Sequence, residues 1–396
     1  MVRKAPQQNV RIESVDVLRG LAVMAIMLLH CIEHFNFYSN PETPQFEWLN
    51  FTDKVIWDGL FFAFAGKAYA VFALLFGFSF YIQDRNQRLR GNDFRLRFLW
   101  RLFLLLLIGQ FNAMFFTGEI FTLYALVGVV LVVFCRLKDK ALLVLAIFFL
   151  LQPMDWGKVM FALFNTDYVA GKSLTSYYFG IAFEVQQNGN FIETVKMNLW
   201  EGQLASLTWA LENARVMQTA GLFLLGLYIG RKEYFLDNES NRRVWLKAVG
   251  FGLLIFFPFY GLYNMIPDFV DRQAIIKPLL LIFKSWYNFG FMIMLVGAFL
   301  LVFHLSKDNS MLRRLSPYGK MSMSNYIGQS MIGSLLFYNW GFHLGRYLGT
   351  TFSFLLGIVL FLLQLGFCTW WLNRYPQGPF ERLWKKLTWI GSGRKI

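Results

Sequence analysis

Long apolar segments separated by short polar or basic turns recur along the whole chain. Apolar stretches of about 20 residues follow one another, and a helix of that length crosses the hydrocarbon core of a bilayer. The pattern predicts an all-α, polytopic integral membrane protein with about ten transmembrane helices. The predicted spans are residues 16–35, 54–83, 98–116, 120–136, 141–163, 214–230, 244–265, 276–304, 322–340 and 351–373.

We expect these spans to form a single transmembrane domain over residues 1–396. Residues 11–163 hold the first five predicted helices, with a site for acyl transfer argued below, and residues 214–390 hold the other five. The connection between them, residues 164–213, is rich in aromatic side chains, which argues against disorder. It predicts interfacial helices over the outer mouth of the bundle, which either line an acceptor site or form a structural lid.

Composition and charge fit a membrane protein better than a soluble one. The chain is 56% hydrophobic, with 45 Phe, and only 16% of its residues are charged, against about 25% in soluble domains. The net charge of +14 would favour nucleic-acid binding in a soluble protein, but here the basic residues separate apolar spans, so we expect no nucleic-acid partner.

The distribution of basic residues predicts the topology. With the N-terminus in the cytoplasm, twenty-eight of the 38 Lys and Arg residues fall on the inner side and eight on the outer side. This asymmetry predicts that both the N- and the C-terminus are cytoplasmic. No small-residue cleavage site follows Leu29, so the first apolar segment is predicted to remain as a membrane helix.

The first predicted helix carries one arginine and one histidine on the same stripe. Arg19 and His30 are eleven positions apart, which at about 100° per residue is roughly 20° past three full turns. The two side chains therefore share a face and lie about 16 Å apart along the axis. They are either a snorkelling arginine and a bonded core histidine, or a functional pair, because ionisable groups at membrane depth often mark function.

The second span is longer than one crossing requires and contains Gly66 followed by Lys67. We therefore predict a break near Gly66. A lysine at this depth needs a partner or water. It either pairs with Asp58 or Glu119, or it contacts a substrate.

Two further polar features stand out within apolar sequence. Glu119 lies in the turn between the third and fourth spans and faces either external water or the bundle centre, where a carboxylate can accept a proton or orient a histidine. The ninth span contains Asn325, Tyr326 and Gln329, which form either interhelical hydrogen bonds or part of a substrate site together with Asp58. Lys284 is predicted to be a paired core group.

The segment from residue 85 to 101 contains six arginines. Anionic lipid headgroups would explain them. A phosphate-rich cytosolic cofactor would use the same residues, because arginine binds phosphate bidentately. The candidates for such a cofactor site are Arg19, Arg85, Arg88, Arg90, Arg95 and Arg97.

No known metal or nucleotide motif is present. The three cysteines, Cys31, Cys135 and Cys368, lie in or beside apolar spans without metal-ligand spacing, so we expect them to be core residues and expect no metal.

Several sequence blocks resemble the YeiB-like family of bacterial membrane proteins of unknown function, in the family's order and across nearly the whole chain. The blocks are VDVLRGLAVMAI (15–26), GKAYAVFALLFGFSF (66–80), GEIFTLYALVG (118–128), GLFLLGLYIGR (221–231), YGKMSMSNYIGQS (318–330) and QGPFERLWKKLTW (377–389). The last resembles the family's closing signature.

The YeiB-like family is similar in architecture to transmembrane acyltransferases, including the heparan-glucosamine acetyltransferase and the acyltransferase-three proteins. The resemblance implies a protein of the bacterial cytoplasmic membrane that takes an acyl group from cytosolic acyl-CoA, acetyl-CoA first of all, and places it on an acceptor such as a glycan. Arg19 and His30 match the arginine–histidine spacing of the acyltransferase-three group. YeiB-like members commonly have asparagine at the position of His30. The histidine of the heparan enzyme lies further along, in the external segment, and His34 is the nearest candidate for it here.

These implications give three hypotheses. In the first, Arg19 and the arginines of residues 85–101 hold CoA phosphates, and His30, assisted by Glu119, deprotonates the acceptor or takes the acyl group itself. Asn325, Tyr326 or Lys67 then stabilises the oxyanion. The second is a transporter or exporter of a small solute or lipid, and the third is a membrane scaffold. Membrane lipids are expected partners in each, and a homodimer is allowed.

Overall fold

The computed structural model describes residues 12–33, 35, 46–306 and 310–391, and the regular elements in these ranges are all helices. The first half contains α1 Glu13–Ile32, α2 Glu47–Phe64, α3 Lys67–Arg88, α4 Arg95–Ala113, α5 Phe121–Val127, α6 Val129–Phe134, α7 Asp139–Leu150, α8 Pro153–Phe164, α9 Leu174–Asn188, α10 Phe191–Met197, the π-helix η1 Asn198–Gly202 and α11 Gln203–Glu212. The second half contains α12 Arg215–Arg231, α13 Glu239–Phe269, α14 Gln273–Leu305, α15 Ser310–Arg313, α16 Ser316–Lys320, α17 Ser322–Phe337, the 3₁₀ helix η2 Leu344–Arg346, α18 Thr350–Leu372 and α19 Pro379–Thr388.

Six helical segments in the described residues are long and apolar enough to cross a membrane, and a seventh is added if the bent pair α7–α8 is one span. The six are α1, α2 with α3, α4, α13, α14 and α18. The all-helical prediction is confirmed over the described residues, and the apolar helices indicate a multi-pass membrane protein.

The other predicted spans correspond to shorter helices. Residues 121–134 form α5 and α6, α12 has 17 residues and α17 has 16. A 17-residue helix is about 25 Å long, somewhat less than the hydrocarbon thickness of about 30 Å. Ten crossings and the cytoplasmic orientation of both ends therefore remain predictions.

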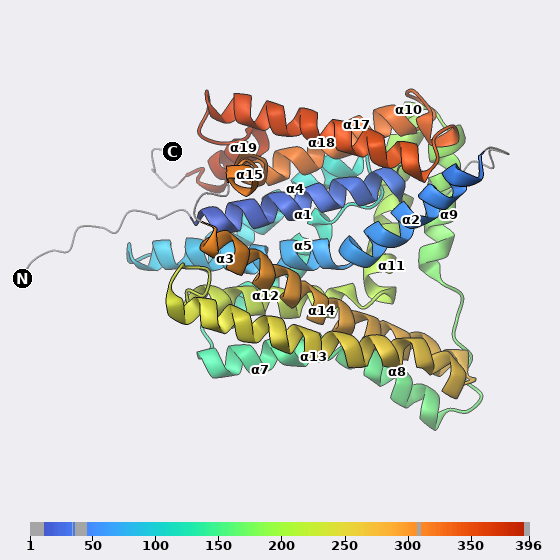
Figure 1. Ribbon diagram of the computed structural model, residues 1–396, viewed down its shortest axis with the longest axis horizontal. Coiled ribbons are helices and arrows are strands. Elements are labelled where there is room, and N and C mark those ends of the chain that lie inside the picture. Colours follow the sequence, from blue (N-terminus) through green and yellow to red (C-terminus); the bar gives the residue numbers. More distant parts are fainter. Residues whose placement is uncertain (1–11, 34, 36–45, 307–309, 392–396) are drawn as a thin grey trace, which may run out of the picture.

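Helix α1 lies in the middle of the bundle and packs against α3, α16 and α18 (Figure 1). Most of its residues are buried, including the turn around Asp16. The long pair α13 and α14 forms one side of the molecule, with α8 packed against α14 and α7 packed against α12 (Figure 1). Polar side chains on α1 therefore face protein rather than lipid along most of its length.

The predicted break in the second span is confirmed. Helix α2 ends at Phe64 and α3 begins at Lys67, and Gly66 between them has a φ of 76°. A Cβ at Gly66 would also lie 3.1 Å from the Asn288 side-chain nitrogen and 3.3 Å from a guanidinium nitrogen of Arg215. Glycine is required here because it adopts the left-handed conformation and leaves room for those groups.

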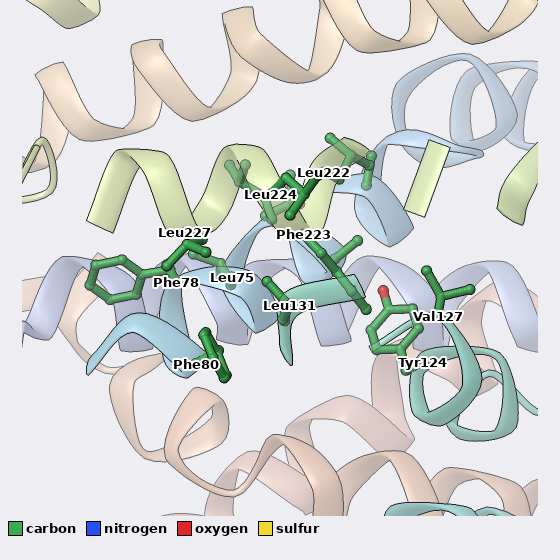
Figure 2. Close-up of a cluster of buried hydrophobic side chains, with 14 of the residues drawn as sticks. Leu75, Phe78, Phe80, Tyr124, Val127, Leu131, Leu222, Phe223, Leu224 and Leu227 are labelled. Carbon is green, nitrogen blue, oxygen red and sulfur yellow. The ribbon is translucent and has the colours of Figure 1, made fainter. Parts of the chain in front are cut away.

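Helices α3 and α12 cross at van der Waals contact of their backbones. A Cβ on Gly77 would lie 2.0 Å from the Phe223 carbonyl oxygen, and one on Gly226 would lie 2.0 Å from the Leu74 carbonyl oxygen. The side chains around this crossing form the main apolar core, with Leu75, Phe78, Phe223 and Leu227 drawn in Figure 2. Small residues at helix crossings are a common means of close packing in membrane proteins.

The long connection between the two halves is folded into short helices, as predicted. Helix α9 runs across the direction of the main bundle at the end away from α19 (Figure 1). Thr117, which precedes α5, donates a hydrogen bond to the Asn198 side-chain oxygen (2.7 Å), and the Gln186 amide donates to the Thr117 hydroxyl. The connection is thus held to the bundle by buried polar contacts.

We predict that Gly77→Ala lowers the free energy of unfolding by about 1–3 kcal/mol, because the added methyl group forces the α3 and α12 backbones apart. The measurement is the thermal unfolding midpoint of the purified full-length chain in detergent. Gly59→Ala is the matched control, since nothing lies within 4 Å of a Cβ at Gly59. Equal midpoints for Gly77→Ala and the wild type would contradict the close crossing.

Candidate functional site

Residues of the described part of the chain line two neighbouring cavities inside the bundle. The first, called the basic cavity here, has a volume of about 410 Å³ and lies among α1, α3, α4, α16 and α19. Its charged lining residues are Arg19, Arg90, Arg101, Lys320, Lys385 and Glu381. Arg90 is exposed, so the cavity reaches the surface at that point. Five cations against one carboxylate make it suited to a ligand with several negative charges.

Arg101 is the most constrained cation of the basic cavity. Its guanidinium lies 3.4 Å from the ring centroid of Trp384, and the indole of Trp384 donates a hydrogen bond to the Arg101 carbonyl oxygen (3.1 Å). Arg101 also donates to the Thr388 hydroxyl (3.3 Å), while its Nε has no hydrogen-bond partner in the described part of the chain. The stacking holds a planar cation in place with donor capacity left over.

Helix α19 brings Trp384 and Lys385 to the cavity because Glu381 anchors it. The Glu381 carboxylate accepts hydrogen bonds from the backbone N–H groups of Met323 (2.8 Å) and Ser324 (3.1 Å), and from the Ser324 hydroxyl. The two backbone N–H groups lie in the first turn of α17, where the helix itself offers no acceptor and a negative charge is favourable. The closing GPFERLWKK sequence therefore docks one helix onto the end of another.

Of the predicted cofactor arginines, Arg19 and Arg90 line the basic cavity. Arg19 donates to the Ser79 hydroxyl (3.1 Å) and lies 3.5 Å from Asp16.

The other four predicted arginines lie elsewhere. Arg85 pairs with Glu233 (2.9 Å) and Arg88 with Asp84 (3.0 Å), and both line a separate shallow groove. Arg95 pairs with Asp93, and Arg97 donates to the carbonyl oxygens of Thr388 (3.2 Å) and Ile390 (3.0 Å) at the end of α19. The hydrogen bonds from Arg95 lower the pKa of the Asp93 carboxyl well below its usual range, so this pair stays ionised. The turn after Arg88 separates the arginines of α3 from those of α4, so they lie on different faces of the bundle. The number of arginines along the sequence does not reveal this separation.

The second cavity, called the histidine cavity here, has a volume of about 250 Å³. It is lined by residues of α1, α2, α3, α5, α12, α14 and α17, of the turn before α5, and of α9 and α11 from the long connection. His30 lines it, with its ring 4.6 Å from that of Phe116 and 5.9 Å from that of Tyr326, measured between centroids. Its other charged lining residues are Glu33, Glu119, Arg215 and Lys284.

The two cavities share a wall. Phe72 and Tyr124 line both of them, and these two rings are nearly stacked with centroids 6.1 Å apart. Tyr124 also packs edge-on against Phe223, beside which it is drawn in Figure 2. On one stripe of α1, Arg19 therefore faces the basic cavity and His30 faces the histidine cavity. The rings of Phe72 and Tyr124 form an aromatic partition between these two chambers. Both chambers also take residues from the second half of the chain, so the site is not confined to residues 11–163.

Glu119 is buried and lines the histidine cavity, which decides between the two orientations expected for it. Its carboxylate accepts hydrogen bonds from the backbone N–H groups of Phe121 and Thr122, the latter at 2.8 Å. It therefore fixes the start of α5, where a negative charge is favourable.

Lys67 lines neither cavity. Its ammonium donates to the Phe62 carbonyl oxygen (2.7 Å) at the end of α2 and lies 5.3–5.8 Å from the centroids of three aromatic rings. Among the described residues it has no carboxylate within ion-pair distance, so the pairing with Asp58 or Glu119 does not occur. Asp58 is exposed and also lies outside both linings.

The polar residues of α17 divide between the two roles considered for them. Tyr326 lines the histidine cavity and donates to the Gly118 carbonyl oxygen (3.4 Å). Asn325 donates to the Tyr318 carbonyl oxygen and Gln329 to the Tyr318 hydroxyl, both at 2.9 Å, and neither lines a cavity. These two amides connect α16 and α17.

For the remaining charged residues, the structure differs from the sequence prediction or adds to it. His34 lies outside the described residues. Lys284, expected to be a paired core group, lines the histidine cavity with no carboxylate within ion-pair distance in the described part of the chain. Arg215 and Lys320 were not singled out, because each stands at a helix end like many interfacial cations.

Comparisons with known proteins find one family model over the C-terminal part of the chain and several uncharacterized bacterial relatives. Residues 229–391 match the model of the family described as "Protein of unknown function (DUF418)". The chain is 26% identical to the "Uncharacterized protein YxaH" of Bacillus subtilis (strain 168), over 96% of this chain and 95% of the relative. It is 27% identical to the "Uncharacterized protein YeiB" of Escherichia coli (strain K12), over 97% of each.

A third relative, the "Uncharacterized 39.9 kDa protein in amylase 3'region" of Bacillus acidopullulyticus, is 23% identical over 96% of this chain and 94% of its own length. No solved structure gives a significant match. These similarities support the resemblance to the YeiB-like family of unknown function, and the matched C-terminal part contains the Glu381 anchor and Trp384.

We predict that Glu381→Ala releases α19 from α17 and lowers the free energy of unfolding by about 2–3 kcal/mol, because three donors lose a charged acceptor. The measurement is the rate of trypsin cleavage after Arg382, Lys385 and Lys386, together with the thermal midpoint. Glu239→Ala removes an exposed carboxylate from a surface ion pair and serves as the control. Unchanged cleavage in Glu381→Ala would show that α19 docks by other contacts.

Proposed function

We propose that the protein is a transmembrane acyltransferase that moves an acyl group from acyl-CoA in the basic cavity to a hydroxyl or amine acceptor in the histidine cavity. The observation that carries the proposal is the pair of chambers that meet at Phe72 and Tyr124, one rich in cations and the other lined by His30. A donor with phosphates at one end and a reactive thioester at the other fits this order of groups.

The donor would be held by the basic cavity. Arg101, stacked on Trp384, presents a planar cation for a phosphate, and Arg19, Arg90, Lys320 and Lys385 supply further charge. The pantetheine arm would point toward Phe72 and Tyr124, so that the thioester reaches the partition between the chambers.

The chemical step would take place beside His30. The acceptor oxygen or nitrogen attacks the thioester carbonyl, His30 takes the acceptor proton as general base, the carbon–sulfur bond breaks, and the CoA thiolate is protonated as it leaves. Of the three residues considered as oxyanion donors, Tyr326 lines the histidine cavity, whereas Asn325 and Lys67 line neither cavity. Glu119 adds a carboxylate that favours the imidazolium, while its hydrogen bonds to the start of α5 give it a positioning role.

We also propose ten crossings in one domain over residues 1–396, with both ends in the cytoplasm of a bacterial cell. Each predicted span corresponds to helix, and the excess of basic residues falls on one side. Hydrogen bonds from Arg97 to the end of α19 place the arginine-rich turn and the C-terminal helix at the same end of the bundle. The basic cavity would then face cytosolic acyl-CoA and the histidine cavity an external acceptor such as a glycan.

A transporter of a small solute or lipid is the second candidate. The break between α2 and α3 at Gly66 favours it, because this irregular backbone lines the histidine cavity, and broken helices form substrate sites in transporters. Uptake of the acceptor into proteoliposomes in the absence of acyl-CoA would support transport, and transfer that depends on acyl-CoA would exclude transport as the main activity.

We predict that Arg101→Gln weakens acetyl-CoA binding to the purified full chain by about 10- to 100-fold, because a charged hydrogen-bond donor is lost. Calorimetry measures the binding, and pantetheine, which lacks the CoA phosphates, should bind weakly to both forms. Arg95→Gln is the control, since Arg95 is exposed and paired with Asp93.

Acetyl-CoA binding also tests the orientation of the protein in the membrane. Acetyl-CoA does not cross membranes, so it should bind inside-out but not right-side-out membrane vesicles. Equal binding by wild type and Arg101→Gln, or binding from the external side alone, would contradict the proposed donor site.

We predict that His30→Ala lowers the rate of acetyl-CoA turnover by about 10²- to 10⁴-fold while acetyl-CoA binding is unchanged, because only the general base is removed. Release of free CoA thiol measures turnover. His343→Ala, which changes a histidine outside both cavity linings, should behave as wild type. Full turnover in His30→Ala would remove this residue from the mechanism.

A further inference from the structure

The wall of the histidine cavity that includes the α2–α3 break carries an excess of positive charge. Arg215 and Lys284 line the cavity, and Lys67 lies behind the lining, close enough to both for their charges to repel. Glu33 interacts with Arg215 and Lys284 across the same wall. The second lining carboxylate, Glu119, is already engaged by the backbone N–H groups at the start of α5, so Glu33 is left to balance these three cations. The acyl-transfer step does not explain this gathering of positive charge.

Arg215 is held in the cavity wall by neutral groups. Its Nη1 donates to the Gln218 side-chain oxygen (2.7 Å), and its guanidinium lies 5.2 Å from the ring centroid of Tyr69 and 5.3 Å from that of Trp209. Its Nε is buried without a hydrogen-bond partner in the described residues, and no described carboxylate lies within ion-pair distance. Neutral groups therefore fix the position of the guanidinium, and Glu33 interacts with its charge without forming an ion pair.

The surroundings of Arg215 contain further unsatisfied polar atoms. The Gln218 side-chain nitrogen and the Asn288 side-chain oxygen are both buried without a hydrogen-bond partner among the described residues. Gly66, whose Cβ would crowd Asn288 and Arg215, keeps this region open. Burying a cation and unpaired polar atoms in a low-dielectric site costs free energy unless a ligand or water forms the missing hydrogen bonds.

Lys284 has no structural task in the described part of the chain. It lies eleven positions into the 33-residue helix α14, about 16 Å from the start of that helix. It is exposed and lines the cavity, and it has no ion pair among the described residues. An ionisable group that lines a cavity without an ion pair points to a substrate or ion site.

We propose that the acceptor carries an anionic group, a phosphate or carboxylate, which Arg215 and Lys284 bind while its nucleophilic hydroxyl or amine lies toward His30. The inference deepens the proposed acyl transfer and rests on it. The anion neutralises the cationic wall and orients the acceptor, so the wall selects acidic acceptors over neutral ones. The same chemistry is offered by a lipid headgroup and by a small soluble anion.

The test measures binding of paired probes to the full-length chain in detergent. Native mass spectrometry compares phosphatidylglycerol with diacylglycerol, and thermal stabilisation compares glycerol 3-phosphate with glycerol. We expect the wild type to prefer at least one anionic probe over its neutral counterpart by about tenfold. Preference for phosphatidylglycerol alone identifies a lipid headgroup, whereas preference for glycerol 3-phosphate identifies a soluble anion, and either result supports the inference.

Charge variants locate the binding. Lys284→Gln and Arg215→Gln should each weaken binding of the preferred anionic probe about tenfold. Lys232→Gln and Arg243→Gln remove cations from surface ion pairs outside both cavities and should bind as wild type. Lys284→Gln keeps the test decisive if Arg215→Gln fails to fold, because Lys284 makes no hydrogen bond or ion pair among the described residues.

Two results would overturn the inference: no preference for an anionic probe in the wild type, or unchanged affinity in Lys284→Gln. Acetyl-CoA binding, measured in parallel, separates this failure from that of the proposed function. A wild type that binds acetyl-CoA without preferring anionic probes overturns the anionic acceptor alone. A wild type that does not bind acetyl-CoA overturns acyl transfer itself.

Discussion

A polar side chain inside an apolar helix bundle must find a partner within the protein or face a cavity, because lipid offers it neither hydrogen bonds nor water. Lys67 binds a backbone carbonyl, Glu119 binds two backbone amides, and Asn325 and Gln329 bind Tyr318. These groups stabilise helix ends and junctions. His30 and Arg215 line the histidine cavity, so the packing that builds the fold also brings these two side chains to one cavity.

The C-terminal helix shows how a short motif completes a distant site. Glu381 joins α19 to the first turn of α17, and this contact places Trp384 under the guanidinium of Arg101, which belongs to α4. The basic cavity therefore depends on three segments that are far apart in the sequence. This arrangement gives the closing signature a physical role, which is to assemble the cationic mouth rather than to react.

The aromatic partition of Phe72 and Tyr124 separates two cavities with different linings. Phe72 and Tyr124 keep the cation-rich side apart from the side that holds His30, and Tyr124 is itself fixed by packing against Phe223. The two cavities thus lie next to each other, and each keeps its own set of charged lining residues.

The sequence by itself determined the helical membrane class, the break at Gly66 and the shared stripe of Arg19 and His30, because these follow from hydrophobic length, glycine chemistry and helical period. It did not determine which arginines face a cavity, since Arg101 meets Trp384 across 283 positions. Arg85 pairs with the distant Glu233 instead, and Arg95 pairs with the neighbouring Asp93. The aromatic partition and the cationic wall of Arg215 and Lys284 likewise arise only when α1, α3, α12 and α14 pack together. Local patterns specify elements, but the side chains that share a chamber are chosen by contacts between elements, which carry no periodic signal along the chain.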